Sequence, residues 1–387
     1  MNRTNEPPGP RRSANVVGAG IAGLAAVLAL RRTGWCVTVH ERAAALAPLG
    51  AGLVLWPNAV HALDALGVGA AVREQAAMLD GSTLRRPDGR WLARNDDPGL
   101  AARHGAPLLG IERSSLQAIL ADAVGPDVVR FGSEVRDSEA LTTGHDMVVA
   151  ADGIRSRVRA AGWRGHAQPA YAGYTVWRAV VTAEAVTPAV SETWGHRERF
   201  GMVPVGSGRV YLFATATVGA QQHAEDPAGE LNDLRSRFGR WHDPIPALLD
   251  ALEPDAVMRH DVHALPRVPR QLHRGTTVLI GDAAHAMEPN LGQGACLALE
   301  DAVVLAHVLG DDVPVDHALA RYSTARRERV AAVSRLSAQI GRLTQDGGPV
   351  RASIRDTAVR LIPARLTKRG MDRTSGWKPP SRPSPER

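Results

Sequence analysis

A glycine-rich hexapeptide near the N-terminus constrains the fold of this chain more than any other feature. The motif, GAGIAG at residues 18–23, stands between a short apolar run at residues 15–17 and an apolar segment of helical character that extends to about Thr33. A second run, rich in β-branched residues, follows at residues 36–39. This order of strand, tight turn, helix and strand predicts the opening of a parallel βαβ unit.

Each glycine of the motif has its own physical purpose in such a unit. Gly18 permits the tight turn, Gly20 lets a diphosphate approach the main chain, and Gly23 lets the helix pack closely on the strand. The helix N-terminus presents unpaired amides to the phosphates. Glu41, at the end of the second strand, is placed to accept hydrogen bonds from an adenosine ribose. The pattern predicts a dinucleotide site without distinguishing nicotinamide from flavin, and a tightly packed turn without a ligand is the alternative.

Composition narrows the class of protein. The chain has 387 residues, 44% of them hydrophobic and 22% charged, which is typical of a globular protein of two or three domains. Two cysteines, Cys36 and Cys296, are too few for a disulfide framework or a multi-thiolate zinc site, and they favour a reducing cytosol. The net charge of +6 is concentrated in residues 351–387, which hold ten basic and three acidic residues. We therefore interpret the basic end as a solvated tail and predict no nucleic-acid partner.

The uncharged stretch at residues 14–30 could be mistaken for an export signal or a membrane span. It is one residue short of the roughly 18 that a span requires, and the glycine motif interrupts it. No small-residue cleavage site follows it. We expect a soluble, cytoplasmic protein with no membrane partner and no metal site.

Two further turns with aspartate and glycine follow apolar strands. Residues 147–150 run into Asp152-Gly153, and residues 277–280 run into Gly281-Asp282. The second turn continues through His285 to a Pro-Asn-Leu-Gly-Gln-Gly sequence at residues 289–294. Taken singly, each aspartate could simply form a turn, and His285 is read as a structural hydrogen-bonding residue.

Together with the glycine motif, these turns resemble the single-component flavin-dependent aromatic hydroxylases, the para-hydroxybenzoate hydroxylase-like monooxygenases, over about residues 14–345. The resemblance implies an α/β fold with a Rossmann-like FAD-binding domain built on a parallel sheet, a mostly antiparallel β-sheet substrate domain and C-terminal helices. Alternating aromatic and polar residues over 166–218 also favour an antiparallel sheet. We divide the chain into a disordered N-terminus (1–13), a discontinuous FAD-binding domain (14–75, 105–165 and 270–335), a substrate domain (76–104 and 166–269), a helical segment (336–373) and a disordered tail (374–387).

The resemblance also implies which residues hold the flavin. The diphosphate and ribose would be held by Gly18, Gly20, Ala22, Gly23, Glu41 and Arg42. The ribityl chain, flavin ring and nicotinamide handling would involve Gly52, Leu53, Arg113, Asp152, Gly153, Asp282, Pro289, Gly292, Gln293, Gly294 and Ala295. A surface ion pair is the alternative interpretation of Arg113.

The substrate side is implied by a narrower similarity to bacterial urate hydroxylases of the family. An arginine and a tyrosine that match Arg199 and Tyr211 line the substrate pocket in those enzymes, so we assign these two residues catalytic roles. Those enzymes have an aspartate where this chain has Asn290, which argues against urate as substrate. Tyr211 could instead pack in the core, and Tyr174, Trp177 and Arg178 could be scaffold.

The activity implied is hydroxylation of an aromatic or other electron-rich ring with O2, through a flavin hydroperoxide, with NADPH or NADH bound only transiently as reductant. A flavin-dependent reductase or dehydrogenase without oxygen insertion is one alternative, and a degenerate flavoprotein that acts as a binding module is another. The Trp-x-Trp-x-Ile-Pro string of related halogenases does not occur. We expect a small aromatic or heteroaromatic substrate and a monomer or homodimer.

Overall fold

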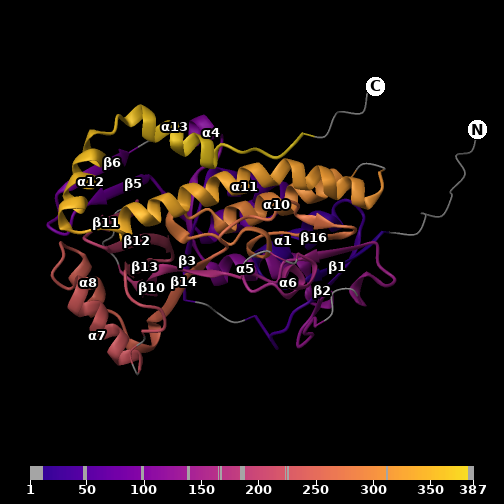
Figure 1. Ribbon diagram of the computed structural model, residues 1–387, viewed down its shortest axis with the longest axis horizontal. Helices are drawn as coiled ribbons and strands as arrows, with labels where there is room; N and C mark the ends of the chain where they lie inside the picture. The colour runs from indigo at the N-terminus through magenta and orange to yellow at the C-terminus, as the bar shows by residue number, and fades with distance from the viewer. Residues whose placement is uncertain are drawn as a thin grey trace, which may run out of the picture.

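A six-stranded sheet carries the glycine motif (Figure 1). The computed structural model describes residues 12–46, 50–96, 100–136, 140–163, 165, 168–183, 188–222, 224, 226–310 and 313–381. The strand order in this sheet is β15 (His273–Arg274), β16 (Thr277–Leu279), β9 (Met147–Ala150), β1 (Ser13–Val17), β2 (Cys36–His40) and β8 (Val129–Arg130). Every neighbouring pair is parallel except β15 with β16. The glycine motif and both aspartate turns therefore follow the carboxyl ends of adjacent strands, where open α/β sheets bind ligands.

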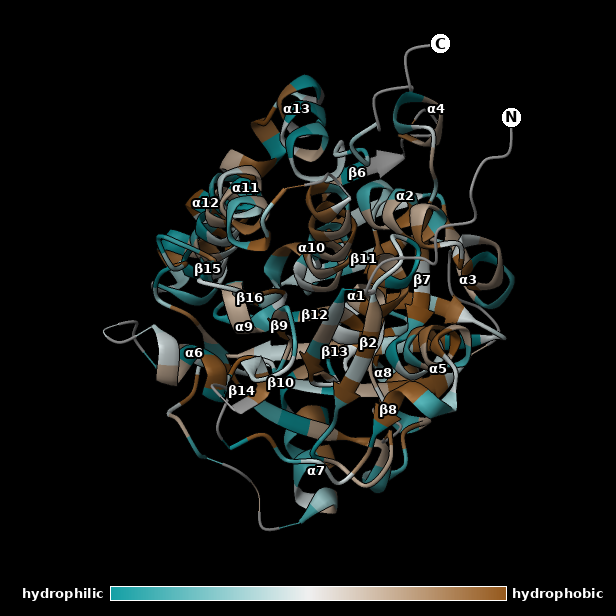
Figure 2. Cartoon of the chain, turned by 90° about the vertical axis from the view of Figure 1, so that its right-hand side faces the viewer, coloured by the Kyte–Doolittle hydropathy of each residue, from teal (hydrophilic) through white to brown (hydrophobic). Residues whose placement is uncertain are grey.

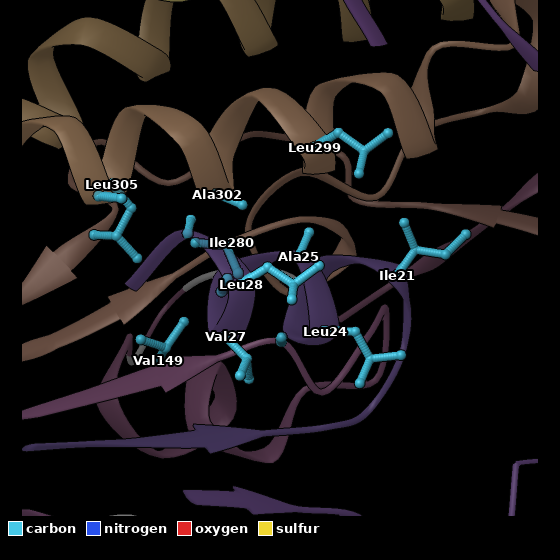
Figure 3. Packing of buried hydrophobic residues seen from close by; sticks show 14 of the residues in the cluster. Ile21, Leu24, Ala25, Val27, Leu28, Val149, Ile280, Leu299, Ala302 and Leu305 are labelled. Atoms are coloured by element: carbon cyan, nitrogen blue, oxygen red, sulfur yellow. The ribbon is translucent and has the colours of Figure 1, made fainter. Parts of the chain in front are cut away.

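Helices α1 (Ile21–Arg31) and α10 (Gly294–Leu309) pack on each other over this sheet. Ala25 and Leu28 of α1 face Leu299 and Ala302 of α10 in the close view of Figure 3, and Leu24 and Val27 lie on the opposite side of α1, toward the strands. Almost every residue of α1 is buried, which explains why the helix is apolar on all sides. Two further helices, α2 (Pro57–Leu66) and α5 (Arg113–Val124), complete this core.

A seven-stranded sheet forms the second half of the molecule. Its order is β14 (Met258–Ala264), β10 (Ala170–Thr182), β13 (Arg209–Ala216), β12 (Glu198–Gly206), β11 (Val190–Trp194), β5 (Gly81–Arg85) and β6 (Trp91–Asp96). Neighbours are antiparallel except β11 with β5. One face, which includes Trp177, Phe200 and Leu212, packs with helices α7 (Pro227–Phe238) and α8 (Ile245–Asp250). Alternate residues of the same strands point to the opposite face, where the site lies.

A three-stranded sheet, β3 (Gly52–Leu55), β7 (Leu108–Glu112) and β4 (Ala77–Leu79), packs on the middle of the seven-stranded sheet. Gly110 in β7 allows this approach, because a Cβ atom there would collide with the carbonyl oxygen of Pro204 in β12. The remaining helices are α3 (Gly69–Gln75), α4 (Leu100–His104), α6 (Arg157–Gly162), α9 (Asp282–His285), α11 (Val315–Gln345), α12 (Pro349–Leu361) and α13 (Ala364–Ser375), with short 3-10 turns at Pro126–Val128, Ala140–Thr142, Pro254–Ala256 and Pro289–Leu291.

The predicted fold class is confirmed: a parallel Rossmann-like sheet, an antiparallel sheet and C-terminal helices. The structure differs from expectation at the two ends of the chain. Ser13 is the first residue of β1, where it pairs with Cys36 of β2, and its amide donates to Asp146 at 2.7 Å. Ser375 is buried and Trp377 packs against the main core, although we predicted disorder from residue 374. Residues 1–11 and 382–387 lie outside the described residues.

Two absences concern the described part of the chain alone. None of its helices combines the length and the apolar character needed to cross a bilayer. Nor do its histidine, cysteine, aspartate and glutamate side chains gather in groups of three or more that could hold a metal ion.

Candidate active site

A cavity of about 520 Å³ lies between the glycine turn, the three-stranded sheet and the inner face of the seven-stranded sheet. This volume is within the roughly 300–1,000 Å³ of typical small-molecule sites. Gly20 to Ala22 line one part of it, and Arg199 and Tyr211 line another. The cavity therefore brings the predicted dinucleotide turn and the predicted substrate residues into one site.

The three glycines of the motif divide into two kinds. Gly18 has a φ of +100°, and a Cβ atom there would lie 2.5 Å from the carbonyl oxygen of Ala151. A Cβ atom at Gly23 would collide with the carbonyl oxygen of Gly18. A Cβ atom at Gly20 would meet nothing within 4 Å, and helix α1 begins there without a side-chain cap. The first and third glycines are thus required for packing, and the second borders the open space of the cavity.

Glu41 contacts the glycine turn and is not part of the cavity wall. One carboxylate oxygen accepts the amide of Ala19 at 2.7 Å, and the other accepts the amide of Ala43 at 2.9 Å. Its neighbour Arg42 is exposed. Glu41 therefore ties the end of β2 to the turn, and each oxygen retains a second lone pair for a further donor.

The two aspartate turns differ from each other. Oδ2 of Asp152 accepts the amides of Arg157 at 2.8 Å and Val158 at 3.3 Å, so this side chain caps helix α6, and Gly153 rather than Asp152 lines the cavity. Asp282 itself lines the cavity and shares it with Arg113. Burial lowers the pKa of the Arg113 guanidinium, while the charge of Asp282 opposes that shift. Asp282 and Arg113 thus form an electrostatic pair on the cavity wall.

The loop after Asp282 is anchored from behind. Gln293 does not line the cavity, because its Oε1 accepts Nδ2 of Asn58 at 3.0 Å. Its neighbours Pro289, Gly292, Gly294 and Ala295 do line it, and a Cβ atom at Gly294 would meet nothing within 4 Å.

A buried charge cluster supports the Gly281-Asp282 turn from the protein interior. Asp301 accepts the amide of Gly281 at 2.9 Å, Nε2 of His285 contacts it at 2.6 Å, and Nε of Arg326 donates to it at 2.7 Å. Burial alone would raise the pKa of Asp301, but the His285 and Arg326 charges outweigh it and hold this pKa at about 2. His285 is fully buried and outside the cavity wall, in agreement with a structural role.

Tyr211 lies on the inner face of the seven-stranded sheet, in the row that pairs it with Val203 and Val180. Its ring packs against the main chain of β3, since a Cβ atom at Gly52 would lie 2.5 Å from the Tyr211 Cβ atom. The side chain is 9% exposed, and burial raises the pKa of its hydroxyl. Tyr211 therefore stays protonated at neutral pH and can donate a hydrogen bond into the cavity.

Arg199 is already engaged by protein partners. One terminal nitrogen donates to Oδ1 of Asn290 and the other to Oε2 of Glu192, each at 2.6 Å. Arg199 is 2% exposed, and its guanidinium lies 5.7 Å from the ring centre of Trp194. Arg199 thus joins β11 and β12 to the loop at Asn290.

The same loop binds β10 and α11 through a second set of contacts. The Tyr174 hydroxyl donates to Glu288 at 3.0 Å, and Nδ2 of Asn290 donates to Glu288 and to the carbonyl of Ser337, both at 3.0 Å. Burial raises the pKa of Glu288, although the hydrogen bonds from Tyr174 and Asn290 oppose this shift. We refer to Tyr174, Glu192, Arg199, Glu288 and Asn290 as the polar network.

Several buried nitrogen atoms around the cavity find no hydrogen-bond partner among the described residues. They are Nε1 of Trp56 and Nε of Arg113, Arg178 and Arg199. All of them are donors, as a ligand rich in phosphate and carbonyl oxygens would require. With the open space beside Gly20 and Gly294, these donors fit the FAD that the sequence implies.

Sequence reasoning identified part of this wall. The cavity is lined by the predicted residues Gly20, Ala22, Gly52, Leu53, Arg113, Gly153, Arg199, Tyr211, Asp282, Pro289, Gly292, Gly294 and Ala295. Gly18, Gly23, Glu41, Arg42, Asp152 and Gln293 lie outside it. Trp56, Arg178, Glu192, Phe213 and Glu288 line it without having been predicted as site residues. Arg178 carried a usable signal, because it alternates along β10 with Trp177, which is buried against α7 and α8 on the opposite face of the sheet.

Comparison with known proteins gives one family and many relatives. A family described as an FAD binding domain matches residues 12–337. The chain is 39% identical over 362 residues to an aurachin C monooxygenase/isomerase from Stigmatella aurantiaca, covering 90% of this chain and 93% of the relative. It is 34% identical over 366 residues to a 2-heptyl-3-hydroxy-4(1H)-quinolone synthase from Pseudomonas aeruginosa, covering 90% and 94%. Among solved structures, HpxO from Klebsiella pneumoniae complexed with FAD and uric acid matches with a TM-score of 0.86 at 30% identity, covering 94% of this chain and 96% of that one.

Proposed function

The chain belongs to the FAD-binding-domain family of flavin-dependent aromatic hydroxylases, and from this premise we propose that it hydroxylates a heteroaromatic ring carrying an apolar substituent. It is an FAD-dependent monooxygenase that uses NAD(P)H as reductant and O2 as the source of oxygen. The observation that supports the substrate class is the mixed wall of the cavity, which is apolar over most of its substrate side and polar at a few points.

FAD lies, in this proposal, along the cavity from the glycine turn to the loop at residues 289–295. The amides at the start of α1 bind its diphosphate, because Gly20 leaves the approach open. Glu41 accepts hydrogen bonds from the adenosine ribose with Arg42 beside it, and Asp282 and Arg113 hold the ribityl side. When bound, FAD supplies the reduction of O2 and the transfer of one oxygen atom, which side chains cannot perform.

Four residues that were predicted to bind the cofactor lie outside the cavity wall and instead position residues that line it. Gly18 and Gly23 let the turn close, Asp152 holds the chain at Gly153, and Gln293 anchors the loop that carries Gly292 and Gly294. We propose these four as positioning residues.

NADPH or NADH binds transiently, and it uses the same FAD-binding unit of residues 14–75, 105–165 and 270–335. A cytoplasmic location is supported by two features: the reaction needs NADPH or NADH, and Cys36 and Cys296 are both free thiols. The substrate unit of residues 76–104 and 166–269 supplies the ring-binding face, and a monomer or homodimer suffices for the reaction.

The substrate side of the cavity favours an alkylated ring over urate. Its apolar wall is formed by Val54, Val176, Val190, Val203, Phe213, Met287 and Leu291. A purine trione with no alkyl group would leave this wall without a partner and its own polar edges unpaired. Asn290, the position where urate hydroxylases carry an aspartate, donates to Glu288 and Ser337 and accepts from Arg199. The quinolone synthase among the relatives is named for a product of this kind, a heteroaromatic ring with a heptyl chain.

Tyr211 is the catalytic residue of the substrate face. It remains protonated because burial raises its pKa, so it orients the ring by donating a hydrogen bond rather than by removing a proton. Arg199 has both terminal nitrogens occupied by Asn290 and Glu192, so we assign it a positioning role in place of the catalytic one. The packing of β3 on Tyr211 holds the tyrosine ring against the cavity wall.

The direct test is turnover by the purified, FAD-loaded enzyme. NAD(P)H oxidation, product and hydrogen peroxide are measured with a 2-alkyl-4(1H)-quinolone that carries hydrogen at carbon 3, with urate and with an unsubstituted phenol. We expect product and tight coupling with the alkylquinolone and mainly hydrogen peroxide with the other two. Efficient hydroxylation of urate would contradict the substrate class, and a protein that reduces an acceptor dye without consuming O2 would indicate a dehydrogenase.

A further inference from the structure

Helix α12 presents its apolar residues to solvent and its charged residues to the protein. Val350, Ile354 and Leu361 are 74%, 64% and 75% exposed. They are four and seven residues apart, so the helical repeat places them on one face. On the opposite face Arg355 and Asp356 are buried. A surface helix of a globular protein ordinarily shows the reverse arrangement.

Specific polar contacts fix this orientation. The Arg355 guanidinium donates to Asp356 at 2.7 Å and to the carbonyl of Gly195 at 3.0 Å, and it lies 5.4 Å from the ring centre of Trp194. Arg86, at the end of β5, approaches Asp356 at 3.5 Å. Rotating α12 to bury its apolar face would break the contacts of this pair with Gly195, Trp194 and Arg86. The exposure of the apolar stripe is therefore built into the fold.

The apolar stripe continues past α12 into α13. Ile362 is 49% exposed and Leu366 is 56% exposed. Both helices lie on the outside of the molecule, drawn in yellow in Figure 1, and Figure 2 shows α13 at the edge with brown and teal segments side by side. We call Val350, Ile354, Leu361, Ile362 and Leu366, with the arginines among them, the basic apolar surface.

The charge on this surface has one sign. Five exposed arginines accompany the apolar residues: Arg351, Arg360, Arg365, Arg369 and Arg373. The two acidic residues of α12 and α13 are both engaged, since Asp356 is buried against Arg355 and Asp372 accepts from His104 at 2.8 Å. Helix α12 packs beside β6, which pairs with β5, and these strands carry Arg94 and Arg85 stacked on the exposed ring of Trp91. In the turn between the two strands, Asp88 lies 3.8 Å from both Arg86 and Arg90.

We propose that the basic apolar surface binds the surface of an anionic lipid bilayer, with α12 lying in the interface and its apolar face among the acyl chains. Apolar side chains flanked by arginine are the pattern of helices that lie in a membrane surface, and Trp and Arg side chains both favour that interface. Charge complementarity selects anionic lipid. A second copy of the chain is a poor occupant, because a two-fold contact would place the five arginines against their own copies.

The test is co-sedimentation of the full-length, FAD-loaded protein with vesicles. We expect binding to vesicles of phosphatidylglycerol and phosphatidylcholine, weakened by salt, and little binding to phosphatidylcholine alone. The apolar variant Val350→Ser/Ile354→Ser/Leu361→Ser should lose about tenfold or more in affinity, because it removes the inserted side chains. The charge variant Arg351→Gln/Arg360→Gln should lose about fivefold for each arginine. All these side chains are exposed, so folding and turnover in solution should be unchanged.

The matched control is Met78→Ser/Phe131→Ser, which removes two exposed apolar side chains elsewhere (67% and 42% exposed). It should bind vesicles as the wild type does. Binding that is absent in the wild type, or equal in the apolar variant, would overturn the proposal. A wild-type dimer that dissociates in the apolar variant would assign the surface to a second copy instead. Both outcomes are independent of the substrate, because neither measurement involves turnover.

Discussion

The cavity has two ends that differ in structure: the glycine end, beside Gly20 to Ala22, and the sheet end, beside Arg199 and Tyr211. The glycine end depends on close packing of the main chain: Gly18 abuts Ala151 and Gly23 abuts Gly18 behind the cavity wall, and Gly20 leaves open space in the wall itself. The sheet end is walled by side chains that meet from distant parts of the sequence, as when Arg199 contacts Asn290 or Tyr174 contacts Glu288. Closely packed main chain has little freedom to change, whereas a wall of side chains can change one residue at a time. This difference explains how relatives with different named substrates share one cofactor-binding fold.

The largest effect is expected at the glycine end. In Gly20→Val the new side chain enters the open space beside α1, so the protein should fold normally but purify without flavin colour. Overpacking costs roughly 1–3 kcal/mol, so FAD affinity should fall by about fivefold to more than a hundredfold. Absorbance of bound flavin and circular dichroism give the two readouts.

Two other glycines serve as controls for that variant. Gly162→Val also adds a side chain in open space, but at the end of α6 outside the cavity wall, so colour should be retained. Gly23→Val should fail to fold, because its Cβ atom collides with the Gly18 carbonyl. A Gly20→Val protein that retains bound flavin would contradict the proposal that Gly20 leaves space for FAD while Gly18 and Gly23 serve packing.

The second prediction concerns the one carboxylate that the glycine end contributes to the cavity. Asp282→Ala should weaken FAD by about ten- to a hundredfold, since hydrogen bonds to charged groups are worth about 1.5–3 kcal/mol. Every substrate should suffer alike when FAD is limiting, and excess FAD should restore turnover. Titration of the apoprotein with FAD measures the effect, and a loss confined to one substrate would move Asp282 to the other end of the cavity.

The third prediction addresses the sheet end alone. Tyr211→Phe should leave FAD affinity unchanged while product per NAD(P)H falls by about five- to tenfold, the value of one hydrogen bond. The moles of hydrogen peroxide formed per NAD(P)H should rise by as much as the moles of product fall. Loss of flavin from this variant, or an unchanged product yield, would return Tyr211 to the apolar core formed with Val203 and Val205.

The smallest effect is a change in the pH dependence of stability. Because the folded state raises the pKa of Glu288 above 4.5, it binds more protons than the unfolded state, so stability falls as pH rises through the window above that value. Glu288→Gln imitates the protonated form and should remove this fall, which for one group is at most about 1.4 kcal/mol per pH unit. Urea denaturation across that window measures it. An unchanged slope would show that Glu288 does not carry the effect.

The sequence predicted more of the glycine end than of the sheet end, because local patterns determine the first and contacts between distant residues determine the second. The glycine turn and Asp282 follow strands of a parallel sheet, so local patterns alone place them at one edge. The polar network depends on how β10, β11 and β12 meet the loop at residues 288–290, where Arg199 joins Glu192 to Asn290 and Tyr174 contacts Glu288. No local pattern reveals those contacts, so Glu192 and Glu288 were missed. Asp152 and Gln293 were placed at the right turns, but only hydrogen bonds in three dimensions show that they face away from the cavity.

The source of the oxygen atom in the product distinguishes a monooxygenase from the other flavoenzymes that this cavity could serve. The FAD-loaded enzyme is supplied with NAD(P)H and an alkylated heteroaromatic ring under oxygen-18 gas in ordinary water, and the product is analysed by mass spectrometry. We expect one oxygen-18 atom in the ring product for each NAD(P)H consumed in coupled turnover. A product whose new oxygen comes from water, or reductant consumption with no labelled product from any ring tested, would contradict the assignment of this cavity to a monooxygenase.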